Sequence, residues 1–145
     1  MIYTTMTKKA INLLFDAHKD QKDKSGLPYV FHPFHVAEQM DDEDSTIVAL
    51  LHDLLEDTSY TVEDLKQIGF NNKVCDALIL MTHDDNVKYL DYIKKIKNNS
   101  IARKVKIADL KHNSDLSRLD IITEYDLERK AKYTKALEIL IFVLN

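Results

Sequence analysis

The sequence has 145 residues, of which 45% are apolar and 30% are charged, and its net charge is −4. It contains only two glycines and two prolines, several-fold below the average usage of ~7% and ~5%. This scarcity excludes collagen-like and Gly/Pro-rich disordered chains, and it disfavours a β-sandwich or barrel, which needs turn residues every ~8–12 positions. A pI near 5.8 also disfavours general nucleic-acid binding, because such proteins carry a basic face. We therefore expect one all-α domain of about seven to eight helices.

The cysteine content and the apolar segments indicate where the protein resides. Cys75 is the one cysteine and cannot form an internal disulfide, which suits a reducing compartment. The N-terminus enters an amphipathic pattern directly and lacks the apolar core of a signal peptide. Every apolar stretch is far shorter than the ~20 residues that span a membrane. The sequence thus predicts a cytoplasmic protein without membrane contact.

Apolar residues recur at helical spacing through most of the chain. In chain order, this spacing predicts helices over about residues 5–20, 33–40, 47–55, 61–68, 72–81, 90–96, 101–112 and 124–142. Residues 24–28 have turn chemistry, and Pro33 suits the first turn of the second helix. Thr61 resembles the N-cap of a short helix that Gly69 ends. The segment 47–55 is apolar almost throughout, as expected for a helix in the middle of a fold.

An adjacent histidine and aspartate, His52 and Asp53, interrupt this apolar segment. Burying a carboxylate without a partner costs several kcal/mol, so a compensating charge is expected. A metal ion is one candidate for that charge. The alternative is a His–Asp pair that bonds a neighbouring helix.

Two further carboxylates, Glu56 and Asp57, follow one helical turn later. Glu56 is four residues after His52, and Asp57 is four residues after Asp53, so each pair is expected to share a helix face. One of these carboxylates could hold or activate a metal-bound water. The alternative is two solvated acids at a helix C-terminus, where the helix dipole disfavours them.

Asp109 is the third candidate, because it falls on the apolar side of its expected helix, with Asn113 four residues later. A buried aspartate requires a cation, which a metal or a salt bridge to Lys106 could supply, unless it caps a helix. His32 or His35 could complete a ligand set of two imidazoles and two carboxylates. Such a mixed set with open positions suits Mn²⁺, Fe²⁺ or Zn²⁺ better than Ca²⁺. It also leaves room for a water that the metal can convert into a nucleophile.

Five motifs follow one another along the chain. They read Ala17-His18-x-x-Gln21, Lys24-Ser25-Gly26-x-Pro28-Tyr29, His32-Pro33-x-x-Val36-Ala37, Leu51-His52-Asp53-x-x-Glu56-Asp57-Thr58 and Val105-Lys106-Ile107-Ala108-Asp109-x-x-His112-Asn113. Together they resemble the hydrolase domain of the RelA/SpoT alarmone enzymes in the HD superfamily, especially the small stand-alone alarmone hydrolases. The resemblance covers most of the chain and implies one HD-type metal-dependent phosphohydrolase domain, a compact helical bundle, over residues 1–145. The implied reaction removes the 3′-pyrophosphate of guanosine tetra- or pentaphosphate to give GDP or GTP and pyrophosphate.

The resemblance also implies roles for individual residues. Four side chains hold a divalent metal ion, usually Mn²⁺ in this family: His32, His52, Asp53 and Asp109. Glu56 and Asp57 position or activate the attacking water. The nucleotide pocket includes Lys24, Ser25 and Asn113. His18 and His35 become structural or supporting residues rather than ligands.

Three places depart from the pattern of the alarmone hydrolases. Asp23 stands where arginine is usual, Leu110-Lys111 replaces Arg-Leu, and Ser114-Asp115-Leu116 lacks the expected basic residue. None of these is an implied metal ligand, so hydrolysis remains the expectation. Two alternatives stay open: an HD-type phosphatase for another nucleotide or phosphoester, and a non-catalytic nucleotide-binding module. Each of these functions takes a small nucleotide or phosphoester as partner rather than nucleic acid or a membrane.

Overall fold

The computed structural model describes residues 1–142, so the last three residues of the expected domain lie outside it. Within the described residues the chain is helical, without strands, apart from an isolated bridge between Lys22 and Pro28. The helices are α1 (Thr5–His18), α2 (Phe31–Glu38), α3 (Glu43–Leu51), α4 (Leu54–Asp57), α5 (Val62–Ile68), α6 (Asn72–Met81), α7 (Tyr89–Lys97), α8 (Ser100–Asn113) and α9 (Glu124–Ile141). The all-α class is therefore confirmed. None of these described helices has the length and hydropathy to cross a membrane.

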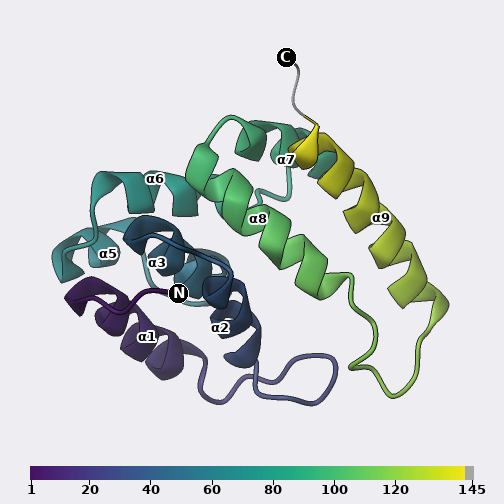
Figure 1. Cartoon of the computed structure of the whole chain (residues 1–145), viewed down its shortest axis with the longest axis horizontal. Coiled ribbons are helices and arrows are strands. Elements are labelled where there is room, and N and C mark those ends of the chain that lie inside the picture. Colours follow the sequence, from purple (N-terminus) through teal and green to yellow (C-terminus); the bar gives the residue numbers. More distant parts are fainter. Residues whose placement is uncertain (143–145) are drawn as a thin grey trace.

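Helix α3 lies at the centre of the bundle, and its residues 45–51 are all buried. Helices α1, α2, α6 and α8 pack against it, whereas α9 lies on the outer side of α8 and α7 (Figure 1). This arrangement agrees with the apolar character of the segment, because a helix that is apolar all round must be covered on every side. The ends of α2, α3 and α8 are thereby brought together in the interior.

Local capping explains where several helices begin and end. The Thr61 hydroxyl accepts a hydrogen bond from Asp64 N at 3.2 Å, which completes the expected N-cap of α5. Gly69 ends α5 with φ of 112°, a left-handed conformation that glycine adopts without steric cost. Helix α3 begins in the acidic run, where the Asp42 carboxylate accepts from Ser45 N at 2.8 Å.

The apolar segment 47–55 is divided between two helices rather than continuous. Helix α3 ends at Leu51, Asp53 has φ of −102° and ψ of 0°, and α4 then adds a single turn. The extra turn raises the number of described helices to nine. At the break the His52 ring donates from Nδ1 to Ala49 O at 2.6 Å, so the side chain satisfies a carbonyl near the end of α3. Sequence periodicity does not report this break, because the chain is helical on both sides of it and Leu54 and Leu55 continue the apolar run.

Candidate metal centre and substrate cavity

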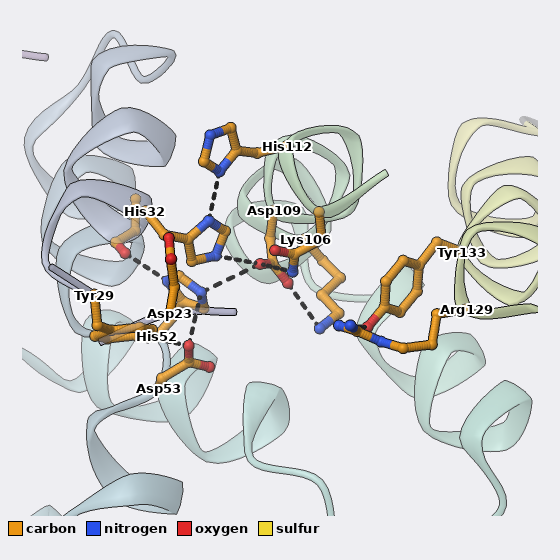
Figure 2. Close-up of polar contacts among 12 residues, drawn as sticks. Asp23, Tyr29, His32, His52, Asp53, Lys106, Asp109, His112, Arg129 and Tyr133 are labelled. Carbon is orange, nitrogen blue, oxygen red and sulfur yellow. Dashed lines mark hydrogen bonds and ion pairs between the residues drawn. The ribbon is translucent and has the colours of Figure 1, made fainter. Parts of the chain in front are cut away.

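Three side chains from three helices meet in the core: His32 of α2, His52 at the end of α3 and Asp109 of α8 (Figure 2). Their exposed fractions are 6%, 3% and 3%. Asp109 Oδ1 lies 2.8 Å from His32 Nε2 and 3.3 Å from His52 Nε2. One ligand atom of each residue lies within 4.8 Å of the other two. We call these three residues the His–His–Asp cluster; their donor set and spacing can hold a metal ion.

The His52 ring has a fixed orientation within the cluster. Because Nδ1 donates to Ala49 O, Nε2 is the nitrogen that faces the carboxylates. Nε2 is buried and has no hydrogen-bond partner in the described part of the chain, although Asp109 Oδ1 and Asp53 Oδ2 lie 3.3 and 3.4 Å away. Burial alone lowers the pKa of His52, but the charges of Asp53 and Asp109 outweigh it and raise the pKa to about 9. A proton or a metal cation is therefore favoured at this nitrogen.

Asp53 lies at the edge of the His–His–Asp cluster, where the Tyr29 hydroxyl donates to its Oδ2. Burial and the charge of Asp53 raise the pKa of Tyr29 far above its usual value, so the phenol stays protonated and remains a donor. Tyr29 belongs to a sequence motif, but its type and position alone do not indicate this contact. The structure thus groups three of the four predicted metal ligands, whereas the fourth, Asp53, lies beside His52 and accepts a hydrogen bond from a phenol.

Lys106 supplies a cation to the cluster, as its Nζ donates to Asp109 Oδ2 at 2.9 Å. The salt bridge that the sequence offered as an alternative to a metal is therefore present, on the carboxylate oxygen that does not face the histidines. Burial alone raises the pKa of Asp109, but Lys106 and His52 hold it well below its usual range. Asp109 is thus an ionised carboxylate with one oxygen turned toward the cluster.

His112 contacts the outer nitrogen of a candidate ligand, with its Nδ1 2.7 Å from His32 Nδ1. Burial and the charges of His32 and Arg118 lower the pKa of His112 to about 4, so the ring is neutral near pH 7. A neutral His112 can accept the Nδ1 proton of His32, which leaves His32 Nε2 free to bind a metal. His35 lies outside the cluster and packs on His112 with ring centroids 4.2 Å apart. His18 is also outside it, with its Nδ1 2.9 Å from Gln21 Oε1.

Glu56 and Asp57 lie in the single turn of α4 and are exposed. Glu56 Oε1 accepts a hydrogen bond from His83 N at 2.7 Å, so this carboxylate joins α4 to the loop before α7. Asp57 N donates to Asp53 O at 3.0 Å, so these two residues are one helical turn apart, as expected. Burial and the charges of Asp53 and Glu56 raise the pKa of Asp57 above its usual value. Asp57 is therefore more readily protonated than an ordinary aspartate.

A cavity of about 240 Å³ adjoins the cluster. Its walls include the three residues predicted for the nucleotide pocket, Lys24, Ser25 and Asn113, together with His32 of the cluster. Asn113 Nδ2 donates to Asp109 Oδ1 at 3.1 Å, which connects the cavity wall to the cluster. The three residues predicted for the nucleotide pocket therefore lie in the wall of one cavity.

The same cavity contains residues that sequence reasoning missed. Arg118 reaches across from the segment between α8 and α9, and its Nη1 lies 3.5 Å from Asp23 Oδ2. Arg129 of α9 donates to the Tyr133 hydroxyl at 3.0 Å and also lines the cavity. Arg118, four positions after Ser114, thus gives this segment a basic side chain in the cavity wall.

Comparisons with known proteins agree with this fold and with the sequence resemblance. No protein-family model matches the chain. It is 36% identical over 86 residues, 57% of its length, to a guanosine-3′,5′-bis(diphosphate) 3′-pyrophosphohydrolase of Aquifex aeolicus. It is 38% identical over 80 residues to the bifunctional (p)ppGpp synthase/hydrolase SpoT of Escherichia coli, and 32% identical over 130 residues to a GTP pyrophosphokinase of Streptomyces coelicolor.

The chain spans only 12%, 11% and 15% of the lengths of these three relatives. A solved structure of a metazoan SpoT ortholog, described as hydrolysing ppGpp, superposes with a TM-score of 0.71 at 24% identity. That match covers 97% of this chain and 85% of the other. The resemblance to RelA/SpoT-type proteins is therefore confirmed, and the chain shares the fold of the metazoan protein.

Proposed function

We propose that this chain is a metal-dependent phosphohydrolase that removes the 3′-pyrophosphate of guanosine tetraphosphate or pentaphosphate. The observation that carries the proposal is the buried His–His–Asp cluster beside a cavity with basic side chains in its walls. Several relatives of similar sequence are named as enzymes for this reaction. The proposed domain occupies the whole chain, residues 1–145.

The residues of the cluster fit a divalent cation, and we propose Mn²⁺. His52 Nε2 is buried and faces two carboxylates without a hydrogen bond in the described residues, an arrangement that a cation would stabilise. His32, His52, Asp53 and Asp109 would hold it. A bound ion of this kind lowers the pKa of a coordinated water and neutralises charge that develops on phosphoryl oxygens.

The chain's own side chains have distinct parts in this hydrolysis. Asp57, whose pKa is raised, accepts the proton of the attacking water, and Glu56 fixes the neighbouring loop through His83 N. Lys106 and Tyr29 keep Asp109 and Asp53 in place. Lys24, Ser25 and Asn113 bind the nucleotide from the cavity wall, because they offer a cation, a hydroxyl and an amide there.

We also place the protein in the cytoplasm. Cys75 is a free, buried thiol, which suits a reducing compartment. The proposed partner is a small nucleotide, since the net charge of −4 does not favour polyanionic nucleic acid.

The purified protein, stripped with a chelator and reloaded with Mn²⁺, is expected to release pyrophosphate and GDP from guanosine tetraphosphate. Chromatography of the nucleotides and an enzymatic pyrophosphate assay measure both products. His52→Ala is expected to lose at least about 100-fold in rate and to lose bound metal, since it removes a ligand. His35→Ala, a nearby histidine outside the cluster, is the matched control and should keep its metal.

Three results would contradict the proposal. If no divalent metal supports release of pyrophosphate from guanosine tetraphosphate, the substrate is wrong. If a panel of nucleotides shows release of orthophosphate instead, the chain is a phosphatase for a different ester. Full metal content and activity in His52→Ala would show that the site itself is wrong.

A further inference from the structure

The cavity must accommodate more of the nucleotide than the group that reacts. His32 and Asn113 lie in its wall and both contact Asp109, so this wall adjoins the His–His–Asp cluster. Other parts of the wall come from the segments between α1 and α2 and between α8 and α9. Under the proposed function the substrate has two phosphate chains, and only the 3′ chain reacts at the cluster. The 5′ chain requires cationic partners elsewhere in the cavity.

Two of the three acidic side chains in the wall, Asp115 and Asp126, are already engaged by donors close to them in the sequence. Asp126 Oδ2 accepts from both the amide and the hydroxyl of Thr123, at 2.9 Å each. Asp115 Oδ1 accepts from Ser117 N at 3.0 Å. The carboxylates of Asp115 and Asp126 thus accept hydrogen bonds from backbone and hydroxyl donors two or three residues away. These acids therefore organise the wall rather than compete for its cations.

Arg118 is a partly buried cation of this wall whose hydrogen-bond donors are only weakly engaged. Its two contacts, Nη1 to Asp23 Oδ2 and Nη2 to His112 O, are both at 3.5 Å, the outer limit of a hydrogen bond. Its Nε is buried and has no partner among the described residues. A guanidinium offers five N–H donors in a planar fork that matches phosphate oxygens. Most of these donors remain available to a ligand in the cavity.

Asp23 holds Arg118 at this position. Asp23 Oδ1 accepts from Ser25 N at 2.9 Å, from the Ser25 hydroxyl at 2.6 Å and from Leu27 N at 3.1 Å, which fixes the loop before α2. Its second oxygen is left to face Arg118. The acid that replaces the usual arginine thus anchors an arginine from the opposite segment.

We propose that Arg118, positioned by Asp23, binds the 5′-phosphate chain of the nucleotide and makes the enzyme selective for 5′-phosphorylated substrates. The identity of the substrate rests on the proposed function. The anion-binding role rests on the unsatisfied guanidinium and the cavity. Arg118 therefore contributes to substrate binding and leaves the chemical step at the cluster unchanged.

The test compares guanosine 3′,5′-bis(diphosphate) with guanosine 3′-diphosphate, which has a 5′-hydroxyl. Arg118→Ala is expected to lower kcat/KM for the first substrate by about 10- to 100-fold, through KM, because a charged hydrogen bond is lost. For the second substrate we expect less than about a threefold change. Arg118→Lys keeps the charge without the planar guanidinium, so its kcat/KM for the first substrate should lie between those of wild-type protein and Arg118→Ala. Lys95→Ala, an exposed lysine on α7, is the control and should change neither.

Equal losses on both substrates would overturn the proposal, since they would mean that Arg118 supports the reacting group or only the fold. Thermal unfolding of each variant shows whether the protein remains folded. An unchanged kcat/KM for both substrates in folded Arg118→Ala would overturn it as well.

A binding measurement separates this proposal from the proposed function. Calorimetry on chelator-treated protein compares GDP with guanosine, neither of which needs to react. Wild-type protein should bind GDP more tightly, and Arg118→Ala should reduce that preference by about 10-fold or more. This outcome stands even if the protein hydrolyses no nucleotide. An unchanged preference would overturn the role of Arg118 without bearing on hydrolysis.

Discussion

The two ring nitrogens of His52 have different partners: Nδ1 contacts the end of α3, and Nε2 faces the carboxylates of the site. Its Nδ1 proton is committed to Ala49 O, so a proton and a metal ion must compete for the same atom, Nε2. The pKa of about 9 means that the metal-free protein carries a proton there near pH 7. Because this pKa lies above the ordinary 6.5, protonation stabilises the metal-free fold below pH 6.5, and that contribution is lost as the pH rises through about 9.

Metal binding should therefore release a proton from His52. We expect metal affinity to rise with pH up to about 9 and then to level off. Calorimetry in buffers of different ionisation enthalpy measures the protons released. His52→Gln should bind metal weakly and without this pH dependence. An affinity that stays constant between pH 6 and about 9 would contradict competition at Nε2.

Lys106 is the largely buried partner of Asp109, and its removal leaves that carboxylate without its ammonium. We expect Lys106→Met to reduce the free energy of unfolding of metal-free protein by about 3 kcal/mol, because the buried carboxylate of Asp109 loses its ammonium partner. Added Mn²⁺ should reverse part of the loss, since it supplies another cation to Asp109. Denaturant unfolding with and without Mn²⁺ measures both values.

Lys104→Met is the matched control, because Lys104 pairs with Asp41 at the surface of the protein. Solvent screens such a pair, so its loss should change the free energy of unfolding little, and Mn²⁺ should make no difference. Equal effects of the two substitutions would show that the Lys106–Asp109 pair is not a buried interaction of the site.

Among the elements, α9 borders the cavity, and its N-cap is Thr123, whose hydroxyl accepts from Asp126 N at 3.3 Å. Thr123→Ala should lower the free energy of unfolding by about 1 kcal/mol, as expected for a lost N-cap. Because fraying of α9 displaces Arg129 and the adjoining wall, KM for the nucleotide should also rise. Thr61→Ala removes the same kind of cap from α5, away from the cavity, and should cost similar stability with no change in KM. A similar rise in KM in both variants would contradict a specific role for the start of α9.

The elements also show what could be predicted from the sequence. Helix positions followed from apolar spacing and caps, because these depend on residues a few positions apart, as at Thr61 and Gly69. The break between α3 and α4 was missed, since it depends on the His52 side chain and on the dihedral angles of Asp53. The contact of Arg118 with Asp23 joins residues 95 positions apart, and no local pattern reports such a contact.

The four predicted ligands were identified through motifs and their order rather than through geometry. The buried position of His32, His52 and Asp109 near one another depends on the packing of α2, α3 and α8, which only the fold supplies. Lys106 shows the limit of such reasoning, because the salt bridge offered as an alternative to the metal lies beside the candidate metal site. The sequence assigns a salt bridge or a metal to Asp109, but it cannot show that Lys106 contacts Oδ2 while Oδ1 faces the histidines.

At the scale of the whole molecule, the cluster joins helices that are distant in the sequence. His32 comes from α2, His52 from the end of α3 and Asp109 from α8, and the three helices pack together (Figure 1). An ion bound by these residues would therefore cross-link the centre of the bundle. A ligand that binds only the folded state stabilises it in proportion to the logarithm of its concentration over Kd.

We accordingly expect Mn²⁺ to raise the Tm of the chelated protein. At a concentration 100-fold above Kd the stabilisation is about 2.7 kcal/mol, which corresponds to a shift of roughly 5–10 °C for a chain of this size. Thermal unfolding with increasing Mn²⁺, followed by excess chelator, measures the shift and its reversal. Asp109→Asn should abolish the shift, because it removes the carboxylate that faces both histidines, whereas Asp44→Asn, an acid of the surface run, should retain it. If Mn²⁺ raises the Tm of wild-type protein and Asp109→Asn equally, the ion binds elsewhere, and the three helices are not joined through a metal.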